Sequence, residues 1–209
     1  MTTVPEAEGE LRPMLRLAVP VVLAEMGWFA MSIVDTVMVG PLGPSAIAAV
    51  GTGGILFMTL MVFGFGTLLA LDTFVSQNFG AGRIDECHRW LFAGLQLAAV
   101  LAVALMVVAQ VGVWGLPHFG FHPDLLPELT AYTELLVWSA PPLFAYVVCR
   151  RYLQAMNLVR PIMIALVAAN VMNAFVNWVF IFGNLGAPAL GVVGAAWATV
   201  ASRVVLAGS

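Results

Sequence analysis

The chain has 209 residues, of which 62% are hydrophobic and 9% are charged, with a formal net charge of −3. An average soluble domain is about 45–50% apolar and about 25% charged, so the composition excludes an ordinary water-soluble globule. Disorder needs low hydrophobicity and high charge, and the same figures exclude it. The composition therefore predicts an all-α polytopic membrane protein that has a lipid bilayer as its main partner.

The first 16 residues are polar, and residues 1–16 are expected to form a cytoplasmic N-terminal segment. No cleavable signal peptide is visible, because the first apolar stretch is long enough to span a membrane. Residues 17–207 are expected to form one bundle of six transmembrane helices. The predicted spans are 17–39, 47–74, 90–114, 130–149, 161–182 and 191–206.

These spans follow from long stretches without any charged residue, at 36–71, 90–123 and 161–202. Each stretch is longer than the roughly 20 residues that one span needs. Segments rich in glycine and proline at 40–44 and 183–188 are expected to break the first and third stretches into pairs of helices.

The eight basic residues are all arginines, and with six spans they all fall on one side of the membrane. By the positive-inside rule this side is cytoplasmic, so the N-terminus is expected to be cytoplasmic. The arginines are too few and too widely spaced for a nucleic-acid partner. They are Arg12, Arg16, Arg83, Arg89, Arg150, Arg151, Arg160 and Arg203.

The sequence offers no pattern typical of a metal centre or an intramembrane enzyme. Cys87 and Cys149 have no accompanying histidine cluster, which argues against a disulfide scaffold and a zinc site. The three histidines lie outside the predicted spans, and Gly-x-Ser occurs only in the loop at 43–45. A buried Ser–His pair therefore has no candidate, and we expect no catalytic residues, no cofactor and no enzyme activity.

Polar residues inside the spans are candidates for function, because a charge near the bilayer centre costs roughly 2.5–3.5 kcal/mol on insertion scales. At about 100° per residue, the three asparagines of the fifth span share one face, which must contact protein or a wet cavity. The candidates are Glu25 and Asp35 in the first span, Asn170, Asn173 and Asn177 in the fifth, and Thr199 in the sixth.

Depth separates these candidates into two groups. At a rise of about 1.5 Å per residue, Asp35, Asn173, Asn177 and Thr199 can meet in the outer half of the membrane. Their oxygen atoms suit a hard monovalent cation, or a carboxylate that takes up and releases a proton. The alternative role of the asparagines is hydrogen bonding between helices.

Three further polar residues have less specific interpretations. Glu25 is deeper than Asp35 and, with Asn170, is a candidate for a proton path or a cationic substrate; the alternative for Glu25 is a carboxyl group kept neutral by burial. Asp72 is expected at the cytoplasmic interface, either close to Arg83 or Arg89 or as a helix cap.

Motifs along residues 11–207 resemble, in order and spacing, those of the multidrug and toxic compound extrusion (MATE) transporters. The segments that carry the resemblance are Val-Asp-Thr-Val-Met-Val-Gly-Pro-Leu-Gly at 34–43, Ala-Ala-Val-Gly at 48–51, Leu-Asp-Thr at 71–73 with Ser-Gln-Asn-Phe-Gly-Ala-Gly at 76–82, Arg-Tyr-Leu-Gln-Ala at 151–155 with Arg-Pro at 160–161, Asn173 to Asn177 with Ile-Phe-Gly at 181–183, and Gly-Ala-Ala-Trp-Ala-Thr at 194–199.

The resemblance implies one six-helix lobe of a twelve-helix antiporter that exports drugs or toxic, often cationic, organic compounds by alternating access. It implies a bacterial inner-membrane location and a cation site in the N-terminal lobe at Asp35, Asn173 and Asn177, with Thr199 as a fourth member. The coupling ion is H⁺ or Na⁺, because Asn177 occupies a position that is acidic in some family members. No other metal is implied.

Because twelve-helix family members are longer than this chain, the chain is expected to be the N-terminal lobe only, with the C-terminal lobe absent. Its expected partner is that second six-helix lobe or a second copy of the chain, and a lone lobe is not expected to transport. The alternatives are a flippase of related architecture for lipid-linked oligosaccharides, and a structural or accessory membrane subunit. The flippase is disfavoured here because no arginine is expected deep in a span.

Overall fold

The computed structural model describes Val22 and residues 26–209 of the chain. The predicted N-terminal segment 1–16 and Glu25 lie outside the described residues. Within them the chain is helical, with three short 3-10 turns, η1 to η3. The bounds are Met26–Leu42 for the first helix (including η1, Gly40–Leu42), Pro44–Leu68 for α2, Ala70–Gly80 for α3, Ile84–Gly115 for α4, Leu116–His118 for η2, Leu126–Val137 for α5, Ala140–Ala155 for α6, Val159–Phe182 for α7, Asn184–Gly186 for η3 and Val192–Gly208 for α8.

These helices account for the predicted spans and confirm an all-α membrane fold. Among the described residues, three segments are long and apolar enough to cross a bilayer: Pro44–Gly80, which joins α2 and α3, Ile84–His118 and Val159–Phe182. The first helix and α8 are apolar but shorter. The second predicted span, 47–74, was too short at its C-terminal end, because α3 continues to Gly80.

The fourth predicted span, 130–149, is not one straight helix but the pair α5 and α6. The helix is interrupted at Trp138 and Ser139, whose N–H groups bond three residues back, to Leu135 and Leu136. Pro141 and Pro142 follow at once; each lacks an N–H group, and each ring clashes with the carbonyl four residues earlier. The prolines therefore explain the break, after which the Leu143 N–H bonds to the Ser139 carbonyl at 3.1 Å.

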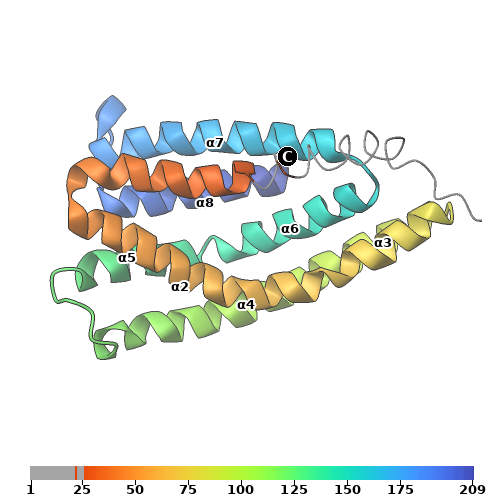
Figure 1. Ribbon diagram of the computed structural model, residues 1–209, viewed down its shortest axis with the longest axis horizontal. Coiled ribbons are helices and arrows are strands. Elements are labelled where there is room, and N and C mark those ends of the chain that lie inside the picture. Colours follow the sequence, from red (N-terminus) through yellow and green to blue (C-terminus); the bar gives the residue numbers. More distant parts are fainter. Residues whose placement is uncertain (1–21, 23–25) are drawn as a thin grey trace, which may run out of the picture.

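The helices form an elongated bundle whose connections lie at its two ends (Figure 1). The first helix, α7 and α8 lie along one side, α2 to α4 along the other, and α5 and α6 between them. The turns after the first helix, α4 and α7 are at one end, and those after α3 and α6 are at the other. This alternation is what the predicted six spans require.

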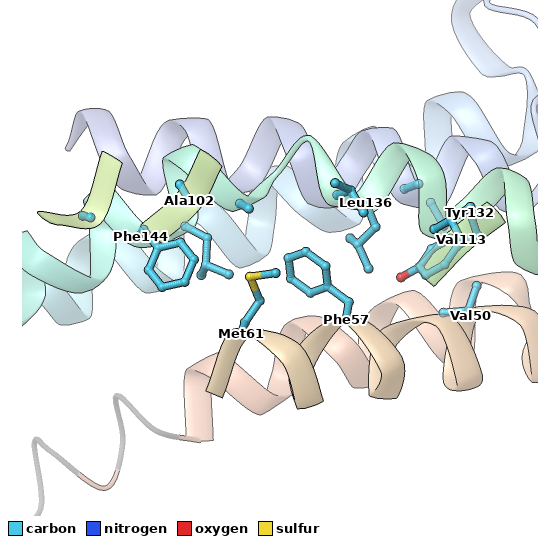
Figure 2. Packing of buried hydrophobic residues seen from close by; sticks show 14 of the residues in the cluster. Val50, Phe57, Met61, Ala102, Val113, Tyr132, Leu136 and Phe144 are labelled. Atoms are coloured by element: carbon cyan, nitrogen blue, oxygen red, sulfur yellow. The ribbon is translucent and has the colours of Figure 1, made fainter. Parts of the chain in front are cut away.

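The core is formed by apolar side chains of α2 that point toward α4, α5 and α6 (Figure 2). Phe57 and Met61 lie in a row between Leu136 of α5 and Phe144 of α6, and all four are at most 2% exposed. Because Phe57 and Met61 are inside a segment apolar enough to cross a bilayer, close van der Waals contact rather than removal of area from water is expected to hold this core together.

Candidate functional site

Asp35 is a carboxylate held inside the bundle. It lies in the first helix, about two turns before that helix ends at Leu42, and only 3% of its surface is exposed. Three side-chain donors converge on its two oxygens from α7 and α8. A buried charge is tolerated only where such partners replace its hydration, so the position of Asp35 depends on all three helices.

Asn173 and Asn177 supply two of these donors from α7. The Nδ2 groups of Asn173 and Asn177 donate to Asp35 Oδ1 at 3.0 Å and 2.7 Å. The Asn177 amide also donates to Asn173 Oδ1 at 3.1 Å. The two residues are four positions apart and thus lie on one face of the helix, and both are fully buried.

Thr199 of α8 completes the cluster on the other carboxylate oxygen. Its hydroxyl donates to Asp35 Oδ2 at 2.8 Å and also lies 3.1 Å from the Ala195 carbonyl one turn earlier. The structure thus brings together Asp35, Asn173, Asn177 and Thr199, the four residues that the sequence placed at one depth. We call them the Asp35 cluster.

One acceptor of the Asp35 cluster has no hydrogen-bond partner in the part of the chain that the structure describes. Asn177 Oδ1 is buried and without a hydrogen bond to any described residue. An unsatisfied buried oxygen is costly, and a cation or a proton-bearing group beside it would remove that cost. Two carboxylate oxygens, two amide oxygens and a hydroxyl are hard ligands of the type that alkali cations prefer, so the donor set fits Na⁺ as well as a proton exchanged at Asp35.

Asn170 is not part of the cluster, although it is on the same helix face. Its Nδ2 donates to the Gly27 carbonyl of the first helix at 2.9 Å and to the Leu166 carbonyl at 2.8 Å. Both acceptors are backbone groups, so Asn170 joins two helices. Its Oδ1 is buried without a hydrogen-bond partner among the described residues.

A cavity of about 190 Å³ opens beside the Asp35 cluster. Asp35 and Thr199 are in its wall, together with residues of α2 and the α5 residue Tyr132. Aromatic side chains from the first helix and α2, Trp28 and Phe57, also line it. The carboxylate therefore faces a space with both polar and aromatic walls.

Arg203 is a polar residue that lines this cavity, a position that the sequence did not predict. It was assigned to the cytoplasmic end with the other arginines, but it points into the bundle and is only 7% exposed. Its Nη1 donates to Ser139 Oγ at the break between α5 and α6. Its guanidinium lies 4.8 Å from the ring centre of Phe57 and 5.9 Å from that of Trp28. The available signal was its spacing, one helical turn after Thr199.

Asp72 is in the C-terminal part of the long α2–α3 segment, and its partner differs from the expected ones. Its Oδ2 accepts from Arg151 Nη1 of α6 at 2.9 Å, rather than from Arg83 or Arg89. Arg89 instead pairs with Glu86 one turn before it, at 2.9 Å. The structure therefore places Asp72 in an ion pair that joins α3 to α6.

The fold and the cluster define a helical membrane protein with a buried carboxylate–amide site next to a cavity, the architecture of a transporter lobe. The MatE family model matches residues 20–179 of the chain. The chain belongs to this family, the MATE transporters, whose members are transporters and not enzymes.

Curated relatives agree with the family assignment. The chain is 34% identical over 199 residues to a probable multidrug resistance protein NorM of Mesorhizobium japonicum, covering 94% of this chain and 43% of the relative. It is 33% identical over 195 residues to the multidrug resistance protein MdtK of Yersinia enterocolitica, covering 91% and 42%. The chain thus spans somewhat less than half the length of these relatives.

Solved structures show the same fold. An outward-facing multidrug resistance MATE transporter of the MOP superfamily matches with a TM-score of 0.78 at 24% identity, covering 92% of this chain and 42% of that one. An inward-facing structure of such a transporter matches with a TM-score of 0.77 at 23% identity, covering 91% and 44%. The helical fold of this chain is therefore found in structures captured in both conformations.

Proposed function

We propose that residues 17–207 form the N-terminal, cation-binding lobe of an H⁺- or Na⁺-coupled antiporter that exports drugs or toxic, often cationic, organic compounds. The observation that carries this proposal is the Asp35 carboxylate, which is buried, held by three donors from two other helices, and exposed to a cavity. Similarity to NorM and MdtK supports multidrug export as the activity.

In this mechanism Asp35 binds either the coupling cation or the cationic substrate, but not both. A proton or Na⁺ on the carboxylate, with oxygens of Asn173, Asn177 and Thr199 around it, cancels the negative charge that attracts a cationic compound. Release of the coupling cation restores that charge. Because each ligand lowers the affinity for the other, the two are exchanged across the membrane rather than carried together.

The other half of the substrate site would come from a second six-helix lobe or a second copy of the chain. The cavity is bordered by residues of the first helix and α2 that are themselves largely exposed, among them Phe29 at 65% and Ile55 at 68%. Such an apolar face is suited to lipid or to an opposing lobe. Rocking of one lobe against the other would provide alternating access in a bacterial inner membrane, with the N-terminus in the cytoplasm.

The buried position of Arg203 affects the comparison with the alternative function, a flippase for lipid-linked oligosaccharides. A buried arginine in the cavity removes the argument that no basic group lies deep in the bundle. A single guanidinium that shares its cavity with a carboxylate nevertheless differs from the strongly basic wall that a pyrophosphate-linked oligosaccharide requires. Transport of a cationic dye with no translocation of a lipid-linked oligosaccharide would favour the antiporter.

The test is gradient-driven efflux by the full gene product in proteoliposomes, with Asp35→Asn as the variant. An imposed H⁺ or Na⁺ gradient is expected to drive export of a cationic dye such as ethidium, and the effective gradient identifies the ion. Asp35→Asn keeps the size of the side chain and is expected to abolish coupled efflux while the protein still inserts and folds. Unchanged efflux would remove Asp35 from the mechanism; loss of activity only through misassembly would favour an accessory subunit.

A further inference from the structure

Arg203 is a buried cation that forms no direct ion pair with a described residue, although the Asp35 carboxylate is near enough to act on it electrostatically. Its contacts among the described residues are the Ser139 hydroxyl and the rings of Phe57 and Trp28. Its Nε is buried and makes no hydrogen bond with these residues. Taking a guanidinium out of water costs several kcal/mol unless an opposite charge or several acceptors compensate, so the arrangement leaves capacity for an anion.

The guanidinium and the Asp35 carboxylate line the same cavity. Arg203 follows Thr199 by four residues on α8, which places the two backbones about 6 Å apart along the helix axis. Thr199 in turn contacts Asp35 directly. The cavity wall therefore presents a negative group, bonded to Thr199, and a positive group whose backbone is one helical turn further along α8, with Trp28 and Phe57 as aromatic surfaces beside the positive one.

We propose that Arg203 binds the carboxylate of a zwitterionic substrate whose ammonium group is directed toward Asp35. Arginine is the side chain best suited to a carboxylate, because its N–H groups match the two oxygens in a fixed geometry. The aromatic rings fit the apolar body of such a compound. This inference deepens the proposed function, on which it rests for the role of the cavity.

A matched pair of fluorescent probes tests the inference by binding alone. Nα-dansyl-L-lysine carries an aromatic body, a side-chain ammonium and a free carboxylate; its methyl ester keeps the first two and lacks the carboxylate. We expect the purified full gene product to bind the acid at least tenfold more tightly than the ester, measured by dansyl fluorescence anisotropy. Equal affinity for the two probes, or binding of neither, overturns the inference.

Variants connect this preference to Arg203. Arg203→Gln is expected to weaken binding of the acid at least tenfold and binding of the ester less than twofold, whereas Arg203→Lys retains part of the preference. The control is Arg160→Gln, which removes an equal charge from an exposed position at the start of α7 and leaves both affinities unchanged. An equal loss of both probes in folded Arg203→Gln and Arg203→Lys means that Arg203 only supports the fold, and overturns the inference. If Arg203→Gln does not fold, the inference is tested by the ratio of acid to ester affinity in the wild-type protein and by the same ratio in Arg203→Lys.

Transport of the same probes separates this inference from the proposed function. Arg203-dependent preference for the acid, without exchange against an H⁺ or Na⁺ gradient in proteoliposomes, would support the carboxylate site and contradict the antiporter. Gradient-driven export of the ester, with no preference for the acid in binding, would support the antiporter and overturn the carboxylate site.

Discussion

Asn177 donates a hydrogen bond of 2.7 Å from its Nδ2 to Asp35 Oδ1, across 142 positions of the sequence. The bond joins α7 to the first helix, and through Asp35 Oδ2 and Thr199 it continues to α8. Three helices therefore meet at one carboxylate. A change in the charge of that carboxylate alters contacts to all of them, which is how binding of a cation at Asp35 would affect the arrangement of the lobe.

Replacement of Asn177 is expected to impair coupling more than stability. Asn177→Ala removes the shortest of the amide contacts to Asp35 and a donor to Asn173. If this contact, worth about 1–3 kcal/mol, is lost from the cation site, cation binding weakens by roughly tenfold or more, so we expect gradient-driven efflux to fall by roughly an order of magnitude. Efflux normalised to the amount of folded protein in proteoliposomes measures this.

Asn170→Ala is the matched control for that experiment. It removes an amide from the same face of α7, but one that bonds only to backbone carbonyls of Gly27 and Leu166. We expect it to lower thermal stability by about 1 kcal/mol and to leave normalised efflux unchanged. Equal losses of efflux in the two variants would mean that the asparagines only join helices.

The sequence predicted the Asp35 cluster because helical geometry relates spacing to position. Asn173 and Asn177 are one turn apart, and a rise of about 1.5 Å per residue sets their depth relative to Asp35 and Thr199. The inward direction of the Arg203 side chain was not predictable in the same way. A single arginine near a helix end is normally interfacial, and its contacts to Phe57 and Ser139 come from helices far away in the sequence.

For the fold as well, the sequence predicted the features set by long apolar stretches and not those set by local contacts. Charge-free stretches predicted the spans, because the bilayer demands them whatever the packing. The break between α5 and α6 was not predicted, although Pro141 and Pro142 are visible in the sequence, because the apolar pattern continues across both prolines. The partner of Asp72 depends on how α3 meets α6, which neither composition nor periodicity specifies.

Close contact between α7 and α8 is expected to require glycine at position 194. A Cβ atom there would lie 2.6 Å from the Phe180 carbonyl carbon and 2.7 Å from its oxygen, so the backbones would have to separate. We expect Gly194→Ala to destabilise the lobe by about 1–3 kcal/mol, and to move Thr199 away from Asp35. Thermal unfolding in detergent and normalised efflux are the measurements.

Gly66→Ala is the comparison for Gly194→Ala. Position 66 is inside α2, and a Cβ atom there meets nothing within 4 Å. Alanine is favoured over glycine in a helix by about 1 kcal/mol, so this variant is expected to be at least as stable as the wild type. If both alanine variants unfold at the same temperature, close approach of α7 and α8 is not what selects glycine at 194.

The Asp72–Arg151 pair is expected to contribute little to the free energy of unfolding, in contrast to the buried Asp35 cluster. Its side chains are 38% and 28% exposed, so water screens the 2.9 Å contact. A double-mutant cycle with Asp72→Asn and Arg151→Gln should give a coupling energy of about 1 kcal/mol or less in thermal unfolding. Efflux should be unchanged in both single variants; a loss in Asp72→Asn alone would assign Asp72 a part in transport.

The orientation predicted from the arginines can be tested by labelling single cysteines at the two ends of the bundle. Asp124 is in the connection between α4 and α5, where 86% of its side chain is exposed, and Asp85 is exposed at the opposite end, in the first turn of α4. With Cys87 and Cys149 replaced by alanine, Asp124→Cys in intact cells should react with a membrane-impermeant maleimide. Asp85→Cys should react only after the membrane is permeabilised, since the positive-inside rule places that end in the cytoplasm. The reverse pattern would invert the lobe and place the Asp35 cluster in the inner half of the membrane.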